Sequence, residues 1–281
     1  MPNANCTVLT AYIVRVKLCF RKTVSAACRT TSNRRGISNN PDFRRFLPSL
    51  TPVIRRCILV SMLRVKRRSS HGTATSRDSA RTRERLLRAA FQEMHLSGFR
   101  SADVDAILAA AGVTRGALYY HFDNKEALGY AVVDEVIASI TQHKWLHPLR
   151  NAKNPIDTLV AIVQSTSLRP EDLECGCPLN NLAQEMSPID EGFRKRTAKV
   201  FKNWHGAIAM ALREGQKRGL VRNDEDPDEA ATFLIAVYEG YLSLAKNSQD
   251  ARILRSGQRN LIAHLESLRT RRGRVAAARQ G

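Results

Sequence analysis

The sequence predicts an all-α protein in which a short N-terminal group of helices precedes a larger helical domain. From Leu86 to Met94, apolar residues recur at spacings of three and four, as they do on one face of a helix, and residues 131–268 continue this pattern. The chain of 281 residues is 43% hydrophobic and 25% charged, with 15 glycines and 10 prolines, which is typical of a globular protein and excludes collagen, a coiled rod and wholesale disorder. Because no apolar run approaches roughly 18–20 residues, we expect no membrane partner.

The net charge of +19 is concentrated at the two ends of the chain. Residues 1–70 carry 15 basic residues and 1 acidic residue, and residues 269–281 carry 5 basic residues and no acidic one. In contrast, residues 71–130 hold 8 basic against 7 acidic residues, and residues 131–268 hold 17 against 18. A nucleic-acid role for this near-neutral middle must therefore come from the local placement of residues rather than from bulk charge.

We expect the two basic ends to lie outside the folded domains. Residues 1–75 are expected to form a basic extension; residues 1–61 show no sustained period, and basic residues interrupt the apolar stretch that a signal peptide requires. Residues 1–61 are interpreted either as a disordered arm that holds nucleic acid electrostatically or as a segment absent from the natural product, which would then begin at Met62. We favour the second interpretation. Residues 269–281 are expected to form a disordered basic tail.

Six cysteines without regular spacing favour a reducing cytosol over a secreted disulfide framework. Four of them lie in the first 61 residues, and Cys175 and Cys177 lie in the body of the chain.

Four helices are expected between residues 79 and 142, each delimited by a capping side chain or a glycine. They run from a Ser79 cap to Gly98, from a Ser101 cap to Gly112, from Arg115 to His121 after a Thr114 cap, and from Asp123 to about Gln142. The turn at residues 110–113, Ala-Ala-Gly-Val, is typical of a helix-turn-helix, because its glycine permits the bend and its alanines allow close helix approach. On spacing alone, it fits a plain helical hairpin equally well.

Residues 98–128, GFRSADVDAILAAAGVTRGALYYHFDNKEAL, resemble the DNA-binding domain of the TetR (TetR/AcrR-type) family of bacterial transcriptional regulators. The match is carried by Gly98-Phe99, Ile107, the turn at 111–113, the run from Thr114 to Phe122, and Lys125 to Leu128. The resemblance implies a helix-turn-helix DNA-binding domain over residues 76–128 and a helical regulatory and dimerisation domain over residues 129–268. In that family the third helix enters the major groove of double-stranded DNA.

Carried over by position, the resemblance implies DNA contacts from Thr114, Arg115, Gly116, Tyr119, Tyr120, His121 and Lys125. The Arg115 guanidinium has the geometry to pair with guanine O6 and N7, whereas Gly116 permits close approach. Tyr120, His121 and Lys125 suit phosphate contacts, which position a protein without reading sequence. The alternative is that one of the tyrosines is a core residue and that His121 makes a structural hydrogen bond.

Further helices are expected over residues 155–167, 179–186, 188–217 with a Ser187 cap and a stop at Gly219, 227 onward, and about 253–268. The last two are apolar on more than one side, so we expect them to pack on their own domain and on a second subunit. The resemblance implies a homodimer through these helices and a palindromic operator with half-sites roughly 34–36 Å apart. The alternative is that they form only a monomer's core.

The resemblance implies a small-molecule effector, but the sequence defines the effector site less well than it defines the DNA-binding residues. Candidate lining residues are Trp145, Phe201, Trp204, His205, Met210, Phe233 and Tyr238, each of which could equally be ordinary core. Cys175 and Cys177 precede a helix start, where the helix dipole lowers a thiol pKa. Some members of the resembled family sense oxidants or electrophiles by thiol chemistry, but both cysteines could also be small residues in a bend.

The sequence shows no nucleophile elbow, phosphate loop, dinucleotide fingerprint or metalloprotease helix, so we expect neither an enzyme nor a cofactor. His143 and His147 are four residues apart, as two metal ligands on one helix face can be, but no third or fourth ligand is indicated by its spacing. We therefore expect no metal. We therefore expect a cytoplasmic, nucleoid-associated dimeric repressor that a small molecule releases from its operator. The alternatives are a thiol-based regulator that uses Cys175 and Cys177, and a nonspecific nucleic-acid-binding protein.

Overall fold

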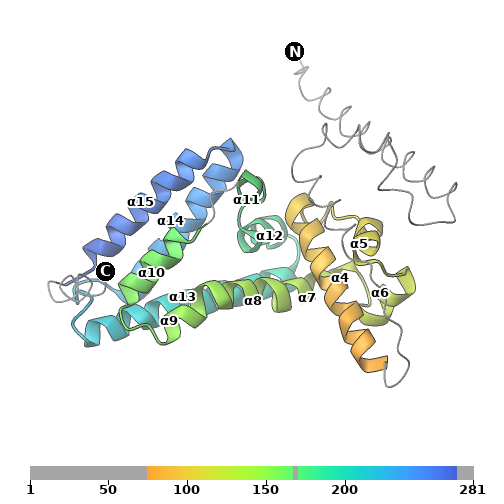
Figure 1. Cartoon of the computed structure of the whole chain (residues 1–281), viewed down its shortest axis with the longest axis horizontal. Coiled ribbons are helices and arrows are strands. Elements are labelled where there is room, and N and C mark those ends of the chain that lie inside the picture. Colours follow the sequence, from red (N-terminus) through yellow and green to blue (C-terminus); the bar gives the residue numbers. More distant parts are fainter. Residues whose placement is uncertain (1–74, 167–169, 271–281) are drawn as a thin grey trace, which may run out of the picture. The chain divides into compact units, whose positions relative to one another are not determined.

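The computed structural model of the chain describes residues 75–166 and 170–270, and it confirms the all-α fold class (Figure 1). Apart from one isolated bridge between Val221 and Arg269, the regular structure of these residues is helical. No helix in the described ranges is long and apolar enough to cross a membrane. The expectations for residues 1–74 and 271–281, including a start at Met62, lie outside the described residues.

Three helices build the N-terminal domain: α4 (Thr75–Ser97), α5 (Val104–Ala111) and α6 (Arg115–His121). Helix α4 packs against both α5 and α6 and buries the apolar face expected from its periodicity. It ends at Gly98, as predicted, where φ is +81°. The prediction of a Ser79 cap was wrong, because the chain is already helical at Thr75. No glycine or proline between Thr75 and Ser79 prevents the helix from starting there.

The two short helices are held by local caps. Helix α5 begins after Asp103, whose carboxylate accepts a hydrogen bond from the Asp105 amide at 2.9 Å, so the prediction of a Ser101 cap was wrong. It ends, as predicted, at Gly112, which adopts φ +63° in the left-handed region that glycine tolerates best. Helix α6 has the predicted Thr114 cap, whose hydroxyl accepts from the Ala117 amide at 3.2 Å.

A long, continuous helix joins the two halves of the described chain. It comprises α7 (Lys125–Ala131), the π-helical segment η3 (Val132–Ile137), α8 (Ala138–Thr141), the π-helical segment η4 (Gln142–Leu146) and α9 (His147–Arg150). The predicted end near Gln142 was wrong, since the helix continues through Pro148. A proline inside an α-helix clashes with the carbonyl four residues earlier. The π-helical segment η4 directly before α9 shifts the backbone hydrogen bonds by one residue and so changes which carbonyl faces the Pro148 ring.

The regulatory half contains α10 (Pro155–Gln164), α11 (Pro170–Cys175), α12 (Pro178–Met186), α13 (Glu191–Lys217), α14 (Pro227–Ser248) and α15 (Ala251–Ser267). Helix α14 packs against both α13 and α15. Helix α11 was not predicted from the sequence, although Pro170 at its first position is a typical helix start. The predicted Ser187 cap of α13 was also wrong, because the Asp190 carboxylate caps it by accepting from the Phe193 amide at 2.8 Å.

One hydrophobic core runs through both halves. The Phe99 ring, beyond the end of α4, meets the Phe193 ring of α13 edge to face at 4.5 Å. Gly129 makes room for this contact, since a Cβ there would lie 2.6 Å from each ring. At the other end, Arg269 is buried and pairs with Asp157 at 2.6 Å, so residues 269 and 270 belong to the folded body rather than to the expected tail.

Candidate nucleic-acid interface and effector site

Helix α6 presents most of the predicted DNA-contacting residues to solvent. Leu118 and Phe122 face the core, with exposed fractions of 2% and 5%, whereas Tyr119 and Tyr120 are 50% and 78% exposed. Neither tyrosine is therefore a core residue. Thr114, Arg115 and Gly116 are also exposed, and His121 is half-buried.

The start of α6 carries the predicted base reader, Arg115, in an ion pair. Its guanidinium donates to Asp105 of α5 at 2.5 Å, and this hydrogen bond raises the pKa of Arg115. Both side chains are more than half exposed, so water screens the pair and it can exchange for another partner. A Cβ at Gly116 would meet only the Thr114 hydroxyl oxygen, at 3.9 Å, so internal packing does not require glycine at this position.

Lys125 also has internal partners. Its ammonium donates to the Arg100 carbonyl at 3.1 Å and lies 5.0 Å from the centre of the Phe99 ring. The start of the long helix is thereby tied to the turn between α4 and α5. A phosphate contact by this half-buried lysine stays a prediction.

Two contacts from other elements hold the helix-turn-helix. The Arg83 guanidinium of α4 lies 5.1 Å from the centre of the Phe122 ring and forms an ion pair with Glu135 of the long helix. In the turn after α4, the amides of Phe99 and Arg100 donate to the Glu185 carboxylate of α12 at 2.7 and 2.8 Å. We call this second contact the Glu185 clamp, since one regulatory side chain holds two consecutive backbone amides of the DNA-binding domain.

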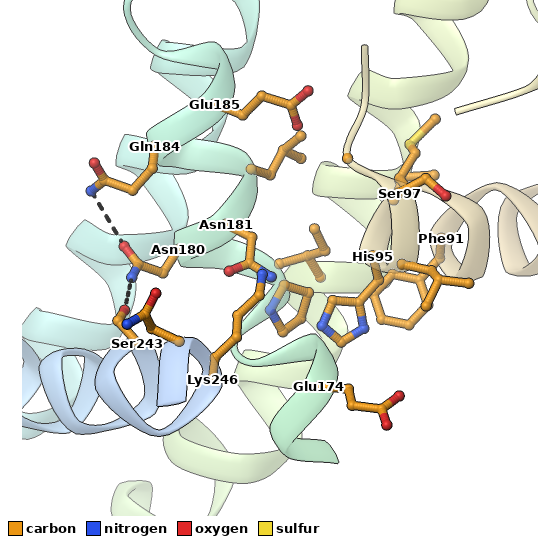
Figure 2. Close-up of a pocket in the computed structure, with 18 of the residues that line it drawn as sticks. Phe91, His95, Ser97, Glu174, Asn180, Asn181, Gln184, Glu185, Ser243 and Lys246 are labelled. Atoms are coloured by element: carbon orange, nitrogen blue, oxygen red, sulfur yellow. Dashed lines mark hydrogen bonds between the residues drawn. The ribbon is translucent and has the colours of Figure 1, made fainter. Parts of the chain in front are cut away.

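A cleft of about 710 Å³ lies beside the Glu185 clamp, and we call it the junction cleft (Figure 2). Its walls come from α4, η3, α11, α12 and α14. The lining side chains include Phe91, Met94, His95, Val132, Glu174, Asn180, Asn181, Leu182, Gln184, Glu185, Ser243 and Lys246. The cleft thus touches both the first helix of the DNA-binding domain and three helices of the regulatory half.

The aromatic residues expected to line an effector pocket form a packed cluster instead. Trp145 and Trp204 have ring centres 4.7 Å apart, and Tyr238 meets Trp145 edge to face at 5.1 Å. The cavity among them measures about 10 Å³, which is room for about one water molecule. The Tyr238 hydroxyl oxygen accepts from the Lys144 ammonium at 2.6 Å, and this bond holds the cluster closed.

The other predicted effector residues do not converge on this cavity. Phe201 stacks beside Trp204 with ring centres 6.2 Å apart, while His205 donates to the Asp228 carbonyl at 3.0 Å, near the start of α14. Met210 and Phe233 are exposed. None of the aromatic and methionine residues named from the sequence lines the junction cleft.

Comparison with known proteins identifies the family. Residues 86–132 match the family profile "Bacterial regulatory proteins, tetR family", and residues 155–261 match "Tetracyclin repressor-like, C-terminal domain". HTH-type transcriptional repressor DhaR of Mycobacterium sp. (strain GP1) is 30% identical over 165 residues, which cover 56% of this chain and 79% of that protein. The chain belongs to the tetR family.

Further relatives agree with this membership. Transcriptional regulator AcuR of Cereibacter sphaeroides is 29% identical over 176 residues, which cover 60% of this chain and 78% of that protein. A crystal structure of a TetR transcriptional regulator from Chloroflexus aurantiacus shares 28% identity and a TM-score of 0.61, covering 68% of this chain and 96% of the other. As a tetR-family member, this chain is a helix-turn-helix DNA-binding transcriptional regulator and not an enzyme.

In this tetR-family chain Cys175 is the last residue of α11 and Cys177 directly precedes α12, and both residues are half-buried. The expectation that the helix start lowers the thiol pKa was wrong for Cys177. Burial raises its pKa, helped by the nearby Glu239 carboxylate, and outweighs the opposing hydrogen bonds from the Asn180 and Leu179 amides. The Cys177 thiol is therefore protonated at neutral pH, which is unfavourable for thiol sensing.

Sequence reasoning missed Glu185, which connects the two domains, and Lys246, which lines the junction cleft. Each lies on an amphipathic helix, where a charged residue is ordinarily a solvated surface residue. Glu239 was missed for the same reason: it is buried, and burial raises its pKa to about 7. No local pattern distinguishes these residues, because their surroundings are formed by other helices.

Proposed function

We propose that this tetR-family chain is a dimeric repressor that binds a palindromic operator through α6 and leaves it when a small molecule binds. The observation that carries the proposal is the two-sided character of α6. Its apolar residues are buried against α4, while Arg115, Gly116 and Tyr119 share an exposed surface at its start. An exposed arginine beside a glycine and a hydroxyl offers a base-reading group with room for close approach.

The neighbouring residues supply the remaining contacts in this proposal. Thr114, Tyr120, His121 and Lys125 would bind phosphates and fix the position of the helix in the groove. The Arg115–Asp105 pair would open on binding, because the exposed pair is weak and a guanine offers two acceptors. The protein would act in the cytoplasm, on the chromosome.

A dimer through α14 and α15 is part of the same proposal. Phe233 and Leu244 are 46% and 57% exposed and lie on one face of α14 with Gly240 between them. A Cβ at Gly240 would have no atom within 4 Å. A second copy of the chain packing on this face would bury both side chains and place two α6 helices one DNA turn apart.

Release from DNA requires an effector that binds one conformation of the dimer better than the other. The long helix supports such a mechanism, because its start is tied to the DNA-binding domain by Lys125 and its middle by the Arg83–Glu135 ion pair. An effector that moved this helix would therefore change the separation of the two reading helices.

The test is selection of bound duplexes from a random DNA pool, with the full chain and its Arg115→Ala variant in parallel. We expect the full chain to enrich a palindrome and the variant to lose or relax it, with affinity for the site lower by about fivefold to hundredfold. Undiminished binding without an enriched site would overturn the proposal and favour nonspecific binding by the basic segments. Because Arg115 is exposed, a melting curve checks that the variant remains folded.

A further inference from the structure

We propose that the junction cleft binds a small organic monocarboxylate, with the Lys246 ammonium pairing with the carboxylate and the apolar wall of α4 and α12 holding the rest of the molecule. The effect of this ligand on DNA binding rests on the proposed function, whereas its binding can be tested alone. Figure 2 shows Lys246 extending from α14 between α12 and α4.

Lys246 is a half-buried cation that lines the junction cleft. Within residues 75–166 and 170–270, its ammonium has no ion pair and no hydrogen bond. Its stem crosses the turn between α11 and α12 at Gly176, which has φ +67° and where a Cβ would lie 3.0 Å from the lysine Cδ. The missing side chain at Gly176 therefore lets Lys246 reach the cleft, and an ammonium in this position favours an anionic partner.

The remaining lining suits an amphiphile with a single negative charge. Phe91, Met94 and Leu182 supply apolar surface, and the Ser243 hydroxyl, which accepts from Asn180 at 3.2 Å, retains its own proton to donate. Glu174 and Glu185 also line the cleft and repel anions, so the single Lys246 cation favours a ligand with one negative charge over a ligand with several. A volume of about 710 Å³ lies within the range of sites for small organic molecules.

The cleft lies between the two contacts that join α4 and its following turn to α11 and α12. On one side is the Glu185 clamp, and on the other the His95 side chain donates through Nε2 to the Gly176 carbonyl at 3.0 Å. The clamped Arg100 in turn accepts from Lys125 through its carbonyl. A ligand that moved α12 relative to α4 would thus act directly on the turn that holds the start of the long helix.

The binding test uses the full chain and calorimetry with three acids, butanoate, octanoate and benzoate, each paired with its neutral amide. We expect at least one acid to bind with a Kd below about 1 mM and its amide to bind at least about tenfold more weakly. The Lys246→Met variant should lose about tenfold to hundredfold in affinity for the acid, and Lys246→Arg should retain most of it. Lys202→Met, at an exposed α13 position outside the cleft, is the matched control and should bind as the parent does.

The inference is overturned if none of the acids binds at millimolar concentration, if acid and amide bind equally, or if Lys246→Met and Lys202→Met behave alike. For the parent and each variant, the ratio of operator affinities with and without the acid then measures regulation. In the parent, we expect the acid to lower operator affinity by at least about fivefold. Lys246-dependent binding without any change in operator affinity would support the site and overturn its regulatory role. Failure to select any operator would overturn the proposed function and leave the calorimetric result standing.

Discussion

Replacing Glu185 by alanine tests whether one side chain couples the regulatory half to the DNA-binding domain. The carboxylate accepts from the amides of Phe99 and Arg100 at 2.7 and 2.8 Å. Hydrogen bonds to an ionised acceptor are worth more than neutral ones, but this contact is partly exposed, so about 1 kcal/mol for each bond is a reasonable value. Loss of both bonds should therefore ease local opening of the turn by about 2 kcal/mol.

Amide hydrogen exchange measures that opening residue by residue. A change of about 2 kcal/mol corresponds to roughly thirtyfold faster exchange at Phe99 and Arg100. Glu185→Gln keeps one acceptor oxygen, so it should accelerate exchange by about fivefold. We expect amides in the middle of α13 to exchange as in the parent, because they have no contact with the clamp.

Glu93→Ala is the matched control for this experiment. Glu93 of α4 also accepts from a backbone amide, that of Asp103 at 3.3 Å, but this contact lies inside the DNA-binding domain. The control should leave exchange at Phe99 and Arg100 unchanged. Parent-like exchange at these two amides in Glu185→Ala would refute the assignment of Glu185 as the link between the domains.

Three further predictions concern packing, titration and assembly. Gly129→Ala should lower the free energy of unfolding by about 1–3 kcal/mol and Tm by about 5 °C, because its Cβ would overlap two phenylalanine rings. Gly206→Ala, with no atom within 4 Å of the new Cβ, is its control, and equal melting of the two variants would contradict the packing argument. Burial raises the pKa of Glu239 to about 7, so the native state binds the proton more tightly than the unfolded state does. Stability should therefore fall by about 3 kcal/mol as pH rises from about 4.5 to about 7, and denaturant titrations of Glu239→Gln should lack this fall. Leu244→Asp should convert a dimer to a monomer in sedimentation experiments, and an unchanged sedimentation coefficient would exclude this face of α14 from the interface.

The helical class and the helix-turn-helix were predictable because their determinants are local. Gly98 and Gly112 end helices by adopting positive φ, and Thr114 caps α6 through a bond to an amide three residues away. Such interactions are encoded within a few consecutive residues and need no knowledge of the fold. Even so, local pattern does not decide between two nearby capping residues, and Asp103 rather than Ser101 caps α5.

Tertiary structure alone decided what surrounds each buried or clustered side chain. Trp145, Trp204 and Tyr238 come together from three helices, but their rings fill the space that the sequence left open for an effector. The pKa of Cys177 depends on burial and on Glu239, which lies 62 residues further along the chain. Periodicity determines which face of a helix is apolar, whereas the helix that covers that face, and the cavity left between them, depend on how distant segments pack.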